Sequence, residues 1–196
     1  MKKLILPVFA ILLSTLIMAS LPTEAEAAIY EDTVRLHILA ASDSDEDQKL
    51  KLELRDELLL KYGNELKSAE NINAAKIKIE ALLPEIKDFI EEKIRERGYS
   101  YTASVALSEE WYDTREYESF TLPSGTYTSL RIIIDEGKGK NWWCVMFPPL
   151  CLDIATENAP KDDGIIDYTK EEINLISNKK YKIKFKVLEL LSGTFR

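Results

Sequence analysis

The sequence predicts an α+β fold: an antiparallel sheet of three to five strands packed by two long helices, preceded by an N-terminal signal segment. Three observations support this prediction. Two long segments between residues 45 and 97 are rich in Leu, Ile, Glu and Lys, with apolar residues at helical spacing. From residue 101, short β-branched and aromatic segments alternate with Gly, Pro and Asn. A basic start followed by an apolar run is typical of export signals.

The N-terminus has the layout of a signal peptide. Two lysines precede an apolar run, and a polar segment with small residues at Ala25 and Ala27 follows. This order predicts a signal peptide over residues 1–27, cleaved after Ala27, and a single α+β domain over residues 28–196. The alternative is an uncleaved membrane anchor, because the apolar run is close to the lower limit of about 17 residues for a bilayer span. In both cases the domain lies outside the cytoplasm.

Composition narrows the function further. The net charge of −8 makes the chain a poor binder of phosphate backbones, because nucleic-acid affinity comes largely from Lys and Arg. A single histidine, His37, excludes metal sites built on several histidines. We therefore expect no nucleic-acid partner, no metal and no cofactor.

The first predicted element is a strand over residues 33–41. Alternation places Leu36 and Ile38 on one side of this strand and Arg35 and His37 on the other.

Two helices are predicted next, over about 45–62 and about 71–97. Ser44, followed three residues later by an acid, resembles a capping box, and Gly63 is a typical C-terminal stop. The second helix contains Pro84, which is expected to bend it because proline removes one backbone hydrogen bond.

The second half of the domain is predicted to be mainly strands joined by short turns. Thr169 and Glu172 have capping-box spacing and predict a short helix to about residue 177. The tail over 181–191 combines alternating lysines with a helix-like end, so both helix and strand stay open there. The predicted strand segments are 101–107, 114–122, 126–135 and 141–147.

Two loops resemble ligand-binding motifs and fail at the positions that matter. The acidic segment 43–47 begins like a calcium loop, but Gln48 and Leu54 stand where that loop requires Gly and Glu. The segment 137–141 resembles a phosphate loop, but no Ser or Thr follows Lys140. We interpret the first as an acidic helix cap and the second as a strand-to-strand turn.

The segment GKGKNWWCVMFPPLC, residues 137–151, contains both cysteines of the chain and two adjacent tryptophans. In an exported chain, a disulfide between Cys144 and Cys151 is favoured. The alternative is a Cys–His nucleophilic pair with His37, which needs a free thiol.

Adjacent residues on a strand face opposite sides, so one tryptophan is expected in the core and the other at the surface. The alternative is that both rings simply pack. An exposed aromatic side chain beside a stiff loop suits protein binding. The candidate partner-binding residues are Lys138, Lys140, Asn141, Trp142, Trp143, Pro148 and Pro149.

Three blocks carry a family resemblance: RLHILAASDSDEDQKLKLELRD, LPSGTYTSLRIII and GKGKNWWCVMFPPLC. They resemble the stage II sporulation protein R family of endospore-forming bacteria. The chain departs from that family's pattern at Ala41, where Asn is expected, and at Glu118 and Asp135, where Gly is expected.

This resemblance implies a signalling protein that is not an enzyme. Such a protein is secreted from the forespore into the space between forespore and mother cell. There it activates a membrane-embedded aspartic protease, which processes the precursor of the mother-cell factor sigma-E. The alternatives are an exported thiol or cell-wall hydrolase using Cys144 and His37, and a wall-binding module.

Overall fold

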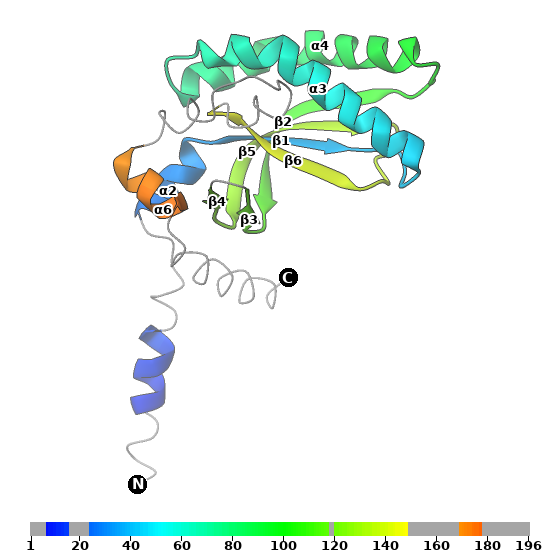
Figure 1. The fold of residues 1–196 in the computed structure, drawn as a ribbon. Helices are drawn as coiled ribbons and strands as arrows, with labels where there is room; N and C mark the ends of the chain where they lie inside the picture. Colours follow the sequence, from blue (N-terminus) through cyan, green and yellow to red (C-terminus); the bar gives the residue numbers. More distant parts are fainter. Residues whose placement is uncertain (1–6, 16–23, 118–119, 149–168, 178–196) are drawn as a thin grey trace.

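A computed structural model describes residues 7–15, 24–117, 120–148 and 169–177 (Figure 1). No helix in these ranges has both the length and the apolar character that a bilayer crossing needs. The α+β class is confirmed, with two long helices and a four-stranded sheet. The elements are α2 (Glu24–Glu31), β1 (Val34–Leu39), α3 (Asp45–Lys67), α4 (Ile72–Glu96), β2 (Ala103–Tyr112), β3 (Arg115–Glu116), β4 (Thr121–Leu122), β5 (Gly125–Ile134), β6 (Asn141–Phe147) and α6 (Lys170–Ser177).

The four-stranded sheet is mixed, so the expectation of an antiparallel sheet was wrong. Its strand order is β2-β5-β1-β6, and β1 pairs in parallel with β5 while β2–β5 and β1–β6 are antiparallel. The central place of β1 follows from its burial, since its first five residues are all buried. A parallel pair needs a long crossover, which the helices α3 and α4 together with β2 provide.

The helices α3 and α4 form one layer that covers one face of the sheet (Figure 1). Most of their buried side chains are Leu or Ile, and burying each of these contributes about 2 kcal/mol. The largest of these are Leu50, Leu54, Leu58, Ile79, Ile86, Ile90 and Ile94.

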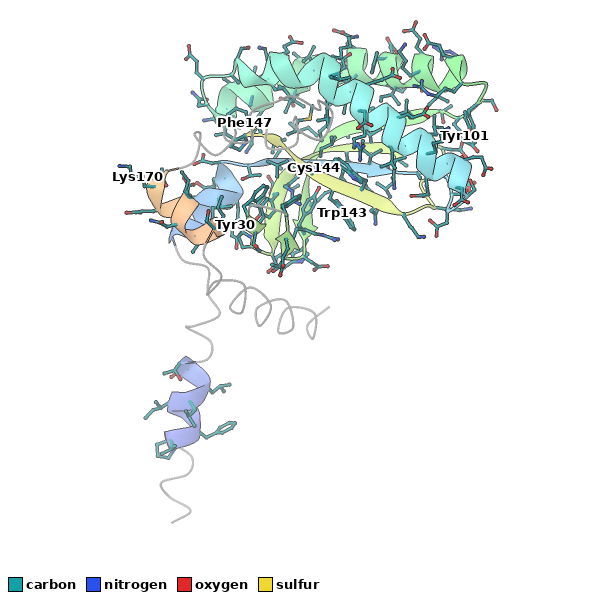
Figure 2. The ribbon with its side chains drawn as sticks, viewed as in Figure 1. Tyr30, Tyr101, Trp143, Cys144, Phe147 and Lys170 are labelled. Atoms are coloured by element: carbon teal, nitrogen blue, oxygen red, sulfur yellow. The ribbon has the colours of Figure 1, made fainter. Side chains whose placement is uncertain are left out.

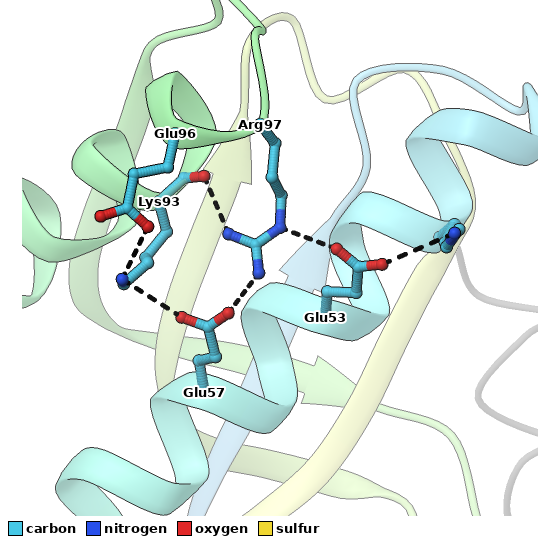
Figure 3. A network of polar contacts seen from close by, with 6 residues as sticks. Glu53, Glu57, Lys93, Glu96 and Arg97 are labelled. Atoms are coloured by element: carbon cyan, nitrogen blue, oxygen red, sulfur yellow. Dashed lines mark hydrogen bonds and ion pairs between the residues drawn. The ribbon is translucent and has the colours of Figure 1, made fainter.

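A polar network joins α3 to the C-terminal end of α4 (Figure 3). The Arg97 guanidinium contacts Glu53 at 2.7 Å and also contacts Glu57, while Lys93 lies 3.8 Å from Glu57 and 2.7 Å from Glu96. Exposed ion pairs contribute little individually, about 0–1 kcal/mol. The network therefore fixes the orientation of the two helices more than it stabilises the fold.

The predicted helix starts are confirmed by their caps. The Asp47 amide donates to Ser44 Oγ at 3.2 Å. The box at α6 is reciprocal, because the Thr169 amide donates to Glu172 Oε2 at 2.6 Å and the Glu172 amide donates to Thr169 Oγ1 at 3.3 Å. The predicted loop after Cys151 and the tail over 181–191 lie outside the described residues.

The predicted end of α3 at Gly63 was wrong, because the helix continues to Lys67. Its apolar stripe continues through Tyr62 and Leu66, each 1% exposed, and their burial exceeds the cost of about 1 kcal/mol for an internal glycine. The second helix likewise runs without interruption through Pro84.

The predicted strands are largely confirmed in position. The strand β2 is longer than expected, and the 114–122 segment forms a small hairpin of β3 and β4 instead of one strand. Asp135, just after β5, has a φ of 55°, the left-handed region that favours the glycine expected there.

The sequence did not predict α2, which spans the predicted cleavage boundary. Ile29 is fully buried, and the Tyr30 ring packs edge-on against Tyr127 with centroids 5.2 Å apart. Ile29 and Tyr30 therefore pack as part of the folded domain. Ala27 is half-buried, and the side chain of Ala25 lies outside the described residues, so cleavage stays a prediction.

Candidate functional site

The turn after β5 packs directly against the loop that follows β1. The Gly139 amide donates to the Ala40 carbonyl at 2.9 Å. A Cβ on Gly139 would lie 2.1 Å from the carbonyl oxygen of Ser42, closer than any side chain can approach. This close backbone approach explains the glycine at this position.

Hydrogen bonds to the backbone hold both lysines of the same turn in place. Their side chains are therefore not needed to fix the turn. The Lys138 amide donates to Ala41, and the Lys140 amide donates to Asp43 Oδ1 at 2.7 Å. The Lys140 carbonyl accepts from Lys51 Nζ at 2.9 Å. Both lysine side chains of the turn are exposed, and that of Lys138 pairs with Glu136.

The two tryptophans face opposite sides of the sheet, as predicted. Trp142 is opposite Ile38 and lies under the Arg55 guanidinium of α3, 4.7 Å from its ring centroid. Trp143 is opposite His37, with ring centroids 5.6 Å apart, on the side away from α3 and α4 (Figure 2). Both rings are half-buried, so the expected division into one core and one surface tryptophan was wrong.

The register separates Cys144 from His37. Cys144 is paired with Leu36 and is fully buried on the helix-covered side, whereas His37 lies on the other face beside Trp143. No free thiol occurs among the described residues. The structure therefore does not bring the two members of the suggested Cys–His pair together. Cys151 lies outside the described residues, so its bond to Cys144 stays a prediction.

The proline pair is described only in part. Pro148 is buried directly after β6, and Pro149 lies outside the described residues. Asn141 is exposed at the start of β6. Three of the predicted partner-binding residues, Lys138, Lys140 and Asn141, are thus exposed near the start of β6. Another of them, Pro148, is buried at the other end of this strand.

A set of polar side chains that the sequence did not single out lies around His37. Its Nδ1 is 3.1 Å from Glu110 Oε2, and its Nε2 is 2.9 Å from Asn141 Oδ1. Both ring nitrogens thus lie within hydrogen-bonding distance of a side-chain oxygen atom. His37 is only 8% exposed, so these contacts hold the ring in place.

Glu110 is the acidic centre of this arrangement. Burial raises the pKa of Glu110, but hydrogen bonds from His37 and Ser129 and the positive charges of His37 and Arg131 outweigh burial, so its pKa lies below the ordinary value. Its Oε1 lies 3.3 Å from Arg131 Nε. The carboxyl group is therefore charged at neutral pH. Its negative charge offsets part of the positive charge around it.

Deeper in the same face, Arg35 is fully buried and contacts no carboxylate in the described part of the chain. Its Nε donates to the Cys144 carbonyl at 3.1 Å and its Nη2 to the Tyr117 hydroxyl at 2.8 Å. The guanidinium also lies over the ring of Tyr112, 4.2 Å from its centroid, and near that of Tyr127. Burial in turn raises the pKa of Tyr112, which stays neutral.

These residues define what we call the polar sheet face, the side of the sheet opposite α3 and α4. The sequence contained one weak sign of it, because Arg35, His37 and Arg131 interrupt otherwise apolar strands at alternate positions. Its members are Arg35, His37, Glu110, Arg115, Arg131, Asn141 and Trp143.

The described residues contain no group of three or more His, Cys, Asp or Glu side chains that could hold a metal ion. A surface pocket of about 290 Å³ lies between the start of α3 and the end of α4. Its charged lining residues pair with one another through Glu53, which lies 3.9 Å from Lys49 and 2.7 Å from Arg97. We find no chemistry assembled in that pocket.

Comparison with known proteins places the chain among sporulation proteins. A family model described as stage II sporulation protein R matches residues 30–157, which include every element from β1 to β6. The chain belongs to the stage II sporulation protein R family.

A curated relative, the stage II sporulation protein R of Bacillus subtilis (strain 168), is 36% identical over 145 residues. The match covers 74% of this chain and 65% of the relative. The chain therefore spans about two thirds of that relative's length. No solved structure matches the chain.

Proposed function

We propose that the chain is an exported sporulation signal that activates a membrane-embedded aspartic protease, and thereby the processing of the sigma-E precursor. The observation that carries the proposal is family membership across residues 30–157, as the resemblance in sequence implied. The signal-like N-terminus supports secretion from the forespore into the space between forespore and mother cell.

The proposed action is binding, without any covalent change in the protease. A ligand shifts a protein between two states only if it binds one of them more tightly. A change from 1:99 to 99:1 needs an affinity difference of about 10⁴-fold. A folded domain with a large exposed surface supplies enough contacts for a difference of that size.

The turn at the start of β6 is one candidate contact. Its backbone is held by the loop after β1, while Lys138, Lys140 and Asn141 are exposed. A disulfide from Cys144 to Cys151 forms part of the proposal, since closing an eight-residue loop restricts the unfolded chain by roughly 2.5 kcal/mol. Such a bond holds the segment after the two tryptophans in one shape.

The alternative of an exported thiol or cell-wall hydrolase is less well supported. It requires His37 to take a proton from Cys144, which lies on the opposite face of the sheet. A folded, exported His37→Ala variant that still signals would exclude the Cys–His mechanism. A free thiol found at Cys144 in the exported protein would favour the enzyme, because a disulfide silences that nucleophile.

The test is reconstitution in a non-sporulating host that expresses the protease and the sigma-E precursor. The chain is supplied in two forms, one complete and one lacking residues 1–27, so that only the first is exported. The proposal predicts precursor cleavage with the exported form alone. Equal cleavage with the form retained in the cytosol would refute the proposed route of signalling.

A further inference from the structure

On the polar sheet face, one arginine lies on each side of the pair formed by His37 and Trp143. The register aligns Arg131 of β5 with His37 of β1, and His37 with Trp143 of β6. Arg115, from β3, lies over the Trp143 ring with its guanidinium carbon 3.8 Å from the ring centroid. These residues form a row across β5, β1 and β6, with the Arg131 guanidinium at one end and the Arg115 guanidinium, from β3, at the other.

Arg115 is oriented by an aromatic ring and forms no ion pair with an acid among the described residues. Its Nε is buried and has no hydrogen-bond partner, and the neighbouring hydroxyl of Thr114 is also buried without one. Buried donors without acceptors are rare in folded proteins and call for an explanation. Stacking on Trp143 fixes the guanidinium in a plane but leaves its N–H donors available.

Arg131 is only partly compensated by its neighbour. Its Nε lies 3.3 Å from Glu110 Oε1, yet makes no hydrogen bond, because the geometry is poor. Glu110 is already engaged by His37. The Arg131 side chain is 40% exposed, so an acceptor arriving from solvent can reach it.

The charge of this face is opposite to that of the whole chain. The net charge of the chain is −8, whereas the row contains two arginines against a single carboxylate, Glu110. Lys140 is exposed where β6 begins, next to Asn141. A local positive region on an acidic protein selects an acidic partner and disfavours wrong ones.

We propose that the polar sheet face docks an acidic peptide segment of a partner protein, whose carboxylates accept hydrogen bonds from Arg115 and Arg131. A carboxylate accepts from two N–H groups of one guanidinium in a bidentate pair. The Nε atoms of Arg115 and Arg131 are buried, so the peptide carboxylates bind the terminal Nη groups. Trp143 lies between the two arginines and provides an aromatic contact for the peptide backbone or an apolar side chain.

The proposal deepens the proposed function, on which the identity of the partner rests. The protease is the partner if that function holds, and its docking segment is then acidic. The docking surface itself depends only on the arrangement of Arg115, Arg131 and Trp143, so the two ideas are tested separately.

The binding test mixes the purified exported protein with a probe peptide, acetylated hexaglutamate amide. Calorimetry at low salt measures the binding. Hexaglutamine is the control peptide. Arg115→Gln and Arg131→Gln should each weaken hexaglutamate binding by about tenfold or more, the loss expected for one hydrogen bond to a charged group. Arg95→Gln makes the same charge change at an exposed site on α4 and should leave binding unchanged.

The outcomes separate the surface from the function. Equal binding of hexaglutamate and hexaglutamine, or equal losses in the Arg95→Gln control, would overturn the docking surface. In the reconstituted host, equal signalling by wild type and by a folded double variant with Arg115→Gln and Arg131→Gln would also overturn the docking surface. Absence of signalling by wild type would instead reject the proposed function, and the peptide result would stand by itself. Arg115→Lys keeps the charge without the planar fork and should bind with intermediate affinity.

Discussion

Substituting Gly139 by alanine tests whether the turn before β6 is fixed by its backbone. The added Cβ would lie 2.1 Å from the Ser42 carbonyl oxygen and 2.9 Å from Ala40 Cβ. Backbone atoms do not move aside as a flexible side chain does, so the turn must shift outward. That shift breaks the bonds from Gly139 to Ala40 and from Lys138 to Ala41.

Each of these hydrogen bonds contributes about 1 kcal/mol net, so together they account for about 2 kcal/mol. Replacing glycine by alanine also reduces the entropy of the unfolded chain, which returns about 0.4–1 kcal/mol. Adding the steric conflict with the backbone, we expect the free energy of unfolding to fall by about 2 kcal/mol in Gly139→Ala.

Gly98 supplies the matched control for this substitution. Its φ is +81°, but nothing lies within 4 Å of an added Cβ, so Gly98→Ala should cost only about 1 kcal/mol, for the left-handed backbone. Urea unfolding followed by tryptophan fluorescence measures both changes, provided that the denaturant slope is unchanged. If Gly139→Ala were no less stable than Gly98→Ala, the close packing of the turn would be refuted.

Three further predictions concern the sheet and its turns. The pKa of folded Glu110 lies below its unfolded value of about 4.3, so its stabilising effect is present above that value and is lost as pH falls through the folded pKa. The stability difference between wild type and Glu110→Gln, measured by urea unfolding, should therefore shrink from pH 6 to pH 3; a constant difference would contradict this. Asp135→Gly should raise the free energy of unfolding by about 0.5 kcal/mol, because Asp135 has a φ of 55°, and a loss of stability would show that its side chain matters. Arg35→Ala should cost about 3 kcal/mol or more in thermal unfolding through the cavity it leaves, while Arg35→Met should cost much less; equal losses would argue for the buried charge itself.

Local features of the sequence predicted the parts of the fold that depend on local physics. The cap at Ser44 and the box at Thr169 form as expected, because a side-chain oxygen and an amide three residues on are brought together by the first helical turn. The end of α3 was missed, because it depends on what Leu66 packs against and not on Gly63 alone.

Long-range pairing was beyond the sequence pattern. The parallel pairing of β1 with β5 joins residues 34–39 to 128–133, and nothing in either segment states the direction of its neighbour. The same reason hid Glu110 as the partner of His37, 73 residues along the chain. It was predictable that the two tryptophans face opposite sides of the sheet, because strand alternation is local. The residues that lie beside each ring were not predictable.

The structure gives packing reasons for the aromatic and glycine-rich segment that differ in part from those first given. Gly139 is needed for close packing against the backbone of Ser42. Trp143 is the ring on which Arg115 rests, and that contact depends on a hairpin that sequence pattern described as one strand.

The central claim is that the chain activates the protease by staying bound and makes or breaks no bond in it. The direct measurement is a titration of purified exported chain onto membrane vesicles that contain the protease with its outer side accessible and the sigma-E precursor inside. The account predicts that precursor cleavage rises with the amount of chain and saturates near stoichiometric occupancy of the protease. Full activation by a small fraction of that amount, given time, would show turnover and contradict the account.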